Sequence, residues 1–241
     1  MLLSLSLVPA TFAQTVKDRE AAVRQDRAMM ENDPRWLYND FKRGFAESNR
    51  TGKPLMVLLR CVPCVACAGI DAQVLKQAER ELSSLLDQFV CVRVINANAL
   101  DLSLFQFDYD LSFSTMIFNG DGTVYGRYGS WTHQHEFQNT TISGYQRALE
   151  AALAIHRGYP GNKATLARKQ VGPIPFKTPV EIPMLAAKYK TDLDWEGKVV
   201  QSCVTATRSA TPSALRIAIR KKSYQPSGFI RCPLRKPSDS P

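Results

Sequence analysis

Three cysteines lie within seven residues of one another, directly after a short apolar run. They are Cys61, Cys64 and Cys67, and they follow the apolar residues 55–59 and Arg60. An amphipathic stretch with helical spacing comes next, so the motif lies between an expected strand and an expected helix. A C-x-x-C motif in that position is typical of a thiol–disulfide redox site. The unpaired N–H groups of a helix N-terminus favour the thiolate, which is the form of cysteine that attacks a disulfide.

The three cysteines allow two overlapping C-x-x-C pairs. Cys61-Val-Pro-Cys64 contains the proline typical of such motifs, whereas helical spacing favours Cys64-Val-Ala-Cys67. Seven residues after Cys67 lies the apolar Val74, and seven residues after Cys64 lies Asp71, which does not suit a buried face. We therefore expect Cys64 to be the exposed attacking sulfur and Cys67 its resolving partner. Cys61 is expected at the strand end, close enough to exchange with Cys64.

The surroundings of the motif resemble a known family. They comprise Trp36, the tripeptide Gly52-Lys53-Pro54, the apolar run and the cysteines. Over residues 34–158 the chain resembles a bacterial thioredoxin-like domain, in which the proline that opens the strand lies about ten residues before the first active-site cysteine. Pro54 precedes Cys64 by ten residues and Cys61 by seven. The resemblance implies an α/β fold, a three-layer α/β/α sandwich with a mixed central sheet, and thiol–disulfide exchange that needs no metal or organic cofactor.

One feature of the family is missing. Thioredoxins carry a cis-proline that faces the active-site sulfurs just before the third core strand, here within residues 111–118. No proline occurs between Pro63 and Pro160. A cis peptide bond without proline costs about 3 kcal/mol, so we expect a trans bond at this position. Substrate docking and the redox potential are therefore expected to differ from those of the family.

Periodicity and turn signals predict the remaining elements of the domain. They are a helix from Asp33-Pro34 to Asn49, strands over 89–95, 113–118 and 123–128, a hairpin turn at 119–122, and a closing helix over 142–156. The cysteines then lie at the C-terminal edge of the first core strand, where open α/β sheets place their sites. Cys91 lies within the second strand and is expected to be an inert buried thiol, because burial raises the pKa of a thiol.

Segments of different composition flank the domain. Residues 1–13 are expected to be a signal peptide, and 14–33 a charged helical spacer with an exposed surface. Residues 159–202 are expected to be a proline-rich extension that wraps the core, with Trp195 as an anchor. Residues 203–241 hold eight basic side chains and one acidic one, so this basic tail carries +7 of the net charge of +9. The tail is expected to be disordered.

The apolar start of the chain ends in Thr-Phe-Ala, which suits cleavage by a signal peptidase near Ala13. We therefore expect a periplasmic or secreted protein whose partners are protein disulfides or dithiols and an exported redox protein. The folded part is nearly neutral, which argues against a nucleic-acid surface. No apolar run after the N-terminus is long enough to span a membrane.

Two other interpretations use the same cysteines. A non-catalytic module could bind a partner or hold a soft ion such as Cu(I) or Zn(II) through the cysteine cluster, with or without His133 or His135 as a further ligand. A purely structural disulfide, Cys61–Cys64 or Cys64–Cys67, would need only an oxidising compartment.

The codons permitted after Val204 raise a further hypothesis. Residues 204–207 are encoded GTN-ACN-GCN-ACN, and a shift of one base after Val204 gives NAC-NGC-NAC, which can spell His-Cys-His. Joined to Cys203-Val204 this reads Cys-Val-His-Cys-His, a c-type haem attachment motif. A covalent haem is expected only if the tail is frameshifted, because the chain as written lacks C-x-x-C-H. The alternative is a disordered basic tail.

Overall fold

The structure is a computed structural model that describes residues 16–64, 68–76, 80–105, 107, 113–129, 142–169 and 175–205. Several predictions lie outside these ranges: the signal peptide, the pairing of Cys67, the environment of His133 and His135, the peptide bond before Phe113, and the tail from residue 206 onward. Within the described ranges, every helix is too short or too polar to cross a lipid bilayer.

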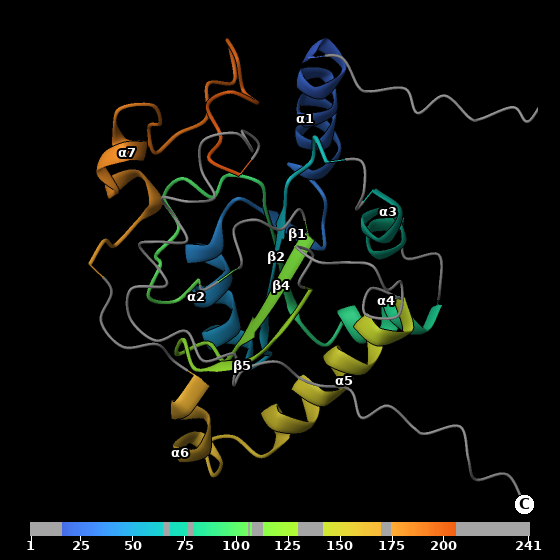
Figure 1. Cartoon of the computed structure of the whole chain (residues 1–241). Helices are drawn as coiled ribbons and strands as arrows, with labels where there is room; N and C mark the ends of the chain where they lie inside the picture. The colour runs from blue at the N-terminus through green and yellow to red at the C-terminus, as the bar shows by residue number, and fades with distance from the viewer. Residues whose placement is uncertain are drawn as a thin grey trace, which may run out of the picture.

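A five-stranded mixed sheet forms the centre of the fold (Figure 1). Its strands are β1 Trp36–Tyr38, β2 Leu55–Arg60, β3 Val90–Val94, β4 Phe113–Phe118 and β5 Val124–Tyr128. The spatial order is β1-β3-β2-β4-β5. β1, β3 and β2 run parallel, whereas β4 pairs antiparallel with β2 and β5 pairs antiparallel with β4. The predicted mixed central sheet is therefore confirmed.

Helices cover both faces of this sheet because its central strand is apolar on both faces. Leu55, Val57 and Leu59 of β2 belong to one core cluster, while Met56 and Leu58 belong to the other. Helix α2 (Phe41–Thr51) covers the first face, and α3 (Ala68–Lys76), α4 (Arg80–Leu86) and α5 (Ile142–Arg157) cover the second (Figure 1). The three-layer α/β/α sandwich expected from the sequence is confirmed.

The predicted helix start at Asp33-Pro34 is wrong. The carboxylate of Asp33 accepts hydrogen bonds from the backbone N–H groups of Arg35 (2.8 Å) and Trp36 (3.1 Å), which closes a turn rather than opening a helix. Trp36–Tyr38 then pairs with β3 as the short strand β1. The Trp-Leu-Tyr sequence favours a strand, and Trp36, which we expected on a helix, is buried in the core at 2% exposure.

The helix begins later, at Phe41, and Asp40 is its N-cap. The carboxylate of Asp40 accepts a hydrogen bond from the backbone N–H of Arg43 at 2.9 Å. The helix ends at Gly52, whose φ of 70° lies in the left-handed region that glycine adopts at helix C-termini. The predicted end of this helix is thus confirmed, although its start is not.

Elsewhere in the domain the predicted elements agree with the structure. The third predicted strand coincides with β4, and the turn at Asn119–Gly122 joins β4 to β5. The closing helix is α5, in which Tyr145, Leu149 and Leu153 form the predicted buried face. The helix ends one residue after His156, whose ring nitrogens form hydrogen bonds with the Tyr125 hydroxyl and the Gly52 carbonyl.

The C-terminal extension packs against the domain, as expected for a wrapping segment. It contains the short elements α6 Lys163–Leu166, η3 Ala167–Lys169, η4 Pro179–Glu181 and α7 Pro183–Ala186. Ile182, Leu185 and Tyr189 join the core cluster on the α2 face of the sheet. Trp195 is a partly buried anchor, since the Arg27 guanidinium lies 4.6 Å from the centre of its ring.

Helix α1 (Val16–Met30) is not the exposed spacer that its charged sequence suggests. Its residues Val23, Asp26 and Met30 are buried. Glu20 accepts a hydrogen bond from the backbone N–H of Val200, and Arg24 donates to the carbonyl of Gly197. Helix α1 and the last part of the extension therefore pack together above the sheet (Figure 1).

Candidate functional site

The cysteine motif begins at the carboxyl end of β2, where the strand gives way to a tight turn. Cys61 follows the last strand residue, and the backbone N–H of Cys64 donates to the Cys61 carbonyl at 3.0 Å. Such a turn brings its first and last Cα atoms within about 7 Å, which overlaps the separation found in disulfides. Cys61 is 7% exposed, whereas Cys64 is half-buried.

A buried arginine, Arg60, stabilises this turn. The Arg60 guanidinium donates to the carbonyl of Cys64 at 2.9 Å and also to the carbonyl of Cys61. Arg60 is 2% exposed, and its Nε lies 3.0 Å from a carboxylate oxygen of Asp71 on α3. Both cysteine carbonyls and the adjacent helix are therefore attached to one cation.

The Asp71 carboxylate also connects the turn to a larger network of buried charged side chains. Asp71 accepts two hydrogen bonds from Arg93 of β3, at 2.8 and 3.0 Å. Arg93, which is fully buried, also binds Asp26 of α1, and Asp26 accepts a hydrogen bond from the Tyr38 hydroxyl at 3.0 Å. Four elements, α1, β2, β3 and α3, thus contribute alternating buried charges, and β1 contributes the Tyr38 hydroxyl.

The position of Asp71 corrects one premise of the sequence argument. We expected Asp71 to be unsuitable for a buried face, but it is only 8% exposed. Burial alone would raise the pKa of its carboxyl, yet the hydrogen bonds and charge of Arg93, together with Arg60, lower the pKa below its ordinary value. Helical spacing alone therefore does not decide between the two cysteine pairs.

The sequence analysis missed this network, although a signal was present. Arg60 ends the apolar strand β2, and Arg93 interrupts the apolar strand β3. In the sheet, Arg93 is paired with Leu58, which lies two residues before Arg60. Both arginines consequently lie on the same face of adjacent strands. A buried cation needs a carboxylate, and the two acids that pair with Arg93 come from α1 and α3.

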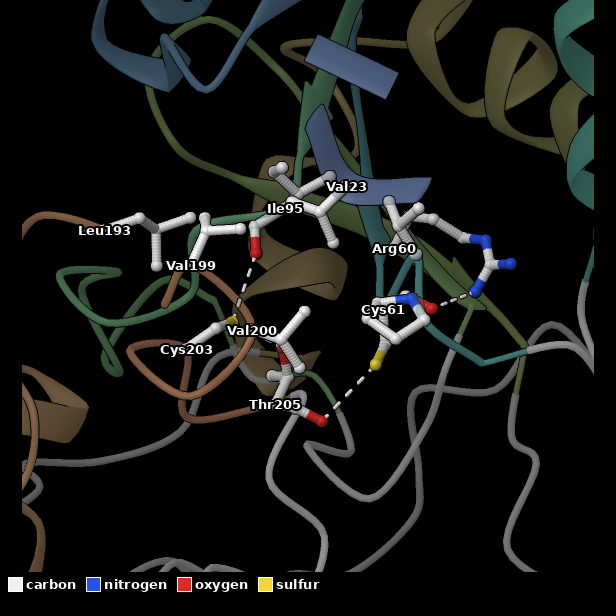
Figure 2. Close-up of a pocket in the computed structure, with 11 residues that line it drawn as sticks. Val23, Arg60, Cys61, Ile95, Leu193, Val199, Val200, Cys203 and Thr205 are labelled. Carbon is white, nitrogen blue, oxygen red and sulfur yellow. Dashed lines mark hydrogen bonds between the residues drawn. The ribbon is translucent and has the colours of Figure 1, made fainter. Parts of the chain in front are cut away.

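A small cavity of about 10 Å³ lies beside the turn (Figure 2). Its walls come from α1, from the cysteine turn, from Ile95 after β3, and from the end of the extension. Cys61 and Cys203 both line it. The volume is close to that of the smallest cavity that holds one water molecule.

Cys203 was placed in a disordered tail by the sequence analysis, and this boundary is wrong. Cys203, Val204 and Thr205 are all less than 8% exposed and belong to the packed structure. The Cys203 sulfur lies 3.4 Å from the carbonyl oxygen of Ile95. The signal that we missed is the apolar pattern around Val199 and Val200, which continues through Cys203 into the fold.

Of the other cysteines and histidines considered in the sequence analysis, one is buried and three lie outside the described residues. Cys91 is 1% exposed, and burial raises the pKa of its thiol to about 12, so the predicted inert thiol is confirmed as buried. Cys67, His133 and His135 lie outside the described residues. In the described part, no three His, Cys, Asp or Glu side chains converge in the way a metal site requires.

Comparison with known proteins agrees with this architecture. Residues 36–120, which run from β1 to the β4–β5 turn, match a family model described as thioredoxin-like. No curated protein matches the chain. The match and the mixed sheet with helices on both faces together show a thioredoxin-like domain in this part of the chain.

Proposed function

We propose that this protein is an exported thiol–disulfide exchange protein that acts through its cysteine cluster. The observation that carries the proposal is the position of Cys64: half-buried, in a turn at the carboxyl end of the central parallel strand of a thioredoxin-like domain. The thiolate of Cys64 attacks a protein disulfide and forms a mixed disulfide. Cys67 then attacks the Cys64 sulfur, which releases the substrate as a dithiol and leaves a Cys64–Cys67 disulfide.

The buried charges support this chemistry by holding the turn in place. The Arg60 guanidinium binds the carbonyls of Cys61 and Cys64, so the first and last residues of the turn are held relative to β2. A positive group close to a cysteine also favours its thiolate.

The proposed compartment follows from the apolar start of the chain and its small residues before Ala13. In an exported compartment the pair would need a redox partner to return it to the starting state, because glutathione and thioredoxin of the cytosol are not available there. The substrates are protein disulfides or dithiols.

Alkylation followed by peptide mapping tests the assignment of the attacking sulfur. The full chain is reduced, exposed briefly to iodoacetamide near pH 7, quenched and digested. Cys64 should be labelled first, because it is the more exposed of the two described motif cysteines. If Cys61 reacts first, the active pair is Cys61–Cys64 and the assignment is wrong.

A redox titration with mass mapping separates exchange from the competing interpretations. It is run with and without Cu(I) or Zn(II). A catalytic pair is expected to have a potential above about −300 mV, whereas a structural disulfide lies below it. Stoichiometric metal binding that protects all three clustered cysteines would support a binding module and contradict the exchange function.

A further inference from the structure

We propose that Cys203 is a fourth redox cysteine, which accepts the disulfide from the motif by exchange with Cys61. This inference rests on the proposed function and deepens it, since it adds a buried acceptor to the same site. It begins from the small cavity, which is lined by two thiols that are separated by 142 positions in the chain and have Thr205 between them (Figure 2).

A single residue, Thr205, contacts both thiols. The Cys61 thiol donates to the Thr205 carbonyl at 3.4 Å, and the Cys203 sulfur lies 3.2 Å from the Thr205 hydroxyl. Thr205 is therefore a hydrogen-bond partner of both thiols, of Cys61 through its carbonyl and of Cys203 through its hydroxyl. Figure 2 shows Thr205 between them.

The surroundings of the pair suit a protected disulfide. Cys61, Cys203 and Thr205 are 7%, 5% and 7% exposed, and apart from Arg60 the other side chains that line the cavity are apolar. Cys64 packs against the same cluster from its half-buried position. Cys64 is therefore the outer cysteine of this cluster, and Cys61 and Cys203 are the two inner cysteines, beside the cavity.

The relay consists of two exchange steps that conserve disulfide bonds. In the first, the Cys61 thiolate attacks the Cys64 sulfur of the Cys64–Cys67 disulfide, forms Cys61–Cys64 and releases Cys67 as a thiolate. In the second, the Cys203 thiolate attacks the Cys61 sulfur, forms Cys61–Cys203 and releases Cys64 as a thiolate. Each released thiolate takes up the proton that the attacking thiol lost. No oxidant is needed beyond the substrate disulfide.

The second step requires a local movement. Disulfides form only when the two Cα atoms lie about 4.4–6.8 Å apart, and Thr205 separates the two sulfurs. Thr205 follows Cys203 by two residues, so it can leave the gap as the end of the extension moves toward β2. The reverse exchange returns the disulfide to Cys64, where a dithiol protein can reduce it.

Mapping of disulfides after oxidation by a disulfide tests the relay. The reduced full chain is incubated with oxidised glutathione, quenched by acid, alkylated and digested. Mass mapping of the wild-type chain should find a peptide that links Cys61 to Cys203. The linked peptide should be lost in Cys203→Ser and in Cys64→Ser, and it should persist in Cys91→Ala, the matched control at a buried thiol in another core cluster.

The outcomes distinguish the relay from the proposed function. Glutathionylated or disulfide-bonded Cys64 without any Cys61–Cys203 link would overturn the relay and leave the exchange function intact. No reaction at Cys64 would overturn both. A link that forms equally fast in Cys64→Ser would show that the buried pair is oxidised independently of Cys64, which also overturns the relay.

Discussion

Replacement of Asp71 by asparagine should destabilise the protein severely, because it removes the carboxylate that two buried arginines share. Asp71 accepts hydrogen bonds of 2.8 and 3.0 Å from Arg93 and lies 3.0 Å from Arg60 Nε. Arg93 keeps Asp26 as a partner after Asp71→Asn, whereas Arg60, at 2% exposure, loses the carboxylate that lies 3.0 Å from its Nε. The amide keeps the size of the side chain, so the change tests charge rather than packing.

The expected magnitude follows from the burial of these groups. A unit charge pair 4 Å apart gains about 4 kcal/mol at an effective dielectric constant of about 20. The variant recovers the cost of burying the Asp71 carboxylate, which offsets part of the lost attraction to two cations. Breaking one partner of a buried pair costs about 3–5 kcal/mol, and we expect Asp71→Asn to lower the free energy of unfolding at pH 7 by this amount.

The effect should depend on pH in one direction. The folded-state pKa of Asp71 is lowered, and the unfolded-state pKa is about 3.9. The stabilisation by the ionised carboxylate is therefore fully present above the unfolded pKa and is lost as the pH falls through the lower folded pKa. The difference between wild type and Asp71→Asn should be constant from pH 7 to 5 and should shrink below about pH 3.9.

Urea denaturation followed by circular dichroism measures this difference at each pH. Glu47→Gln is the control, because it also turns a paired carboxylate into an amide, but its partner Arg50 is exposed. We expect little change for this variant. If Asp71→Asn is no more destabilising than the control at pH 7, the buried network does not stabilise the fold and the reasoning fails.

Three other expectations follow from named residues. Gly44→Ala would place a methyl group 2.5 Å from Val92 Cγ2 and 3.1 Å from Leu55 Cδ1, so overpacking between α2 and the sheet should cost about 1–3 kcal/mol in urea denaturation; an unchanged midpoint would contradict this. Cys91 should resist iodoacetamide in the native protein at pH 8 and react after unfolding, because burial raises the pKa of its thiol to about 12; native labelling as fast as that of Cys64 would refute it. Sequencing of the gene at residues 204–207 tests the frameshift hypothesis, which predicts His-Cys-His in the shifted frame and is wrong if those bases do not encode it.

Local sequence signals predicted most of the sheet and several helix ends. The apolar run of β2, the strand at Phe113–Phe118 and the glycine turn after Asn119 are specified by residues close to one another in the chain. The start of α2 was misplaced because Asp33 and Asp40 are both suitable capping residues. Only pairing with β3 shows that Trp36 belongs to a strand.

The candidate site was predictable only in part, because contacts between distant segments form much of it. Cys61 and Cys64 were identified from their spacing at the end of an apolar run. The burial of Asp71 depends on Arg93, 22 positions away, and the position of Cys203 depends on the return of the extension to the end of β2. The arginines in apolar strands and the apolar residues before Cys203 indicate burial, but they do not show which distant segments meet.

Trapping of a mixed disulfide tests the central claim, that Cys64 is the attacking sulfur of an exchange protein. In a Cys61→Ser/Cys67→Ser double variant, Cys64 has neither neighbouring cysteine of the motif to release a bound substrate. Incubation with a peptide disulfide should therefore accumulate a covalent adduct that mass mapping places at Cys64, and the adduct should disappear on adding dithiothreitol. A folded double variant that forms no adduct at Cys64 would contradict the account.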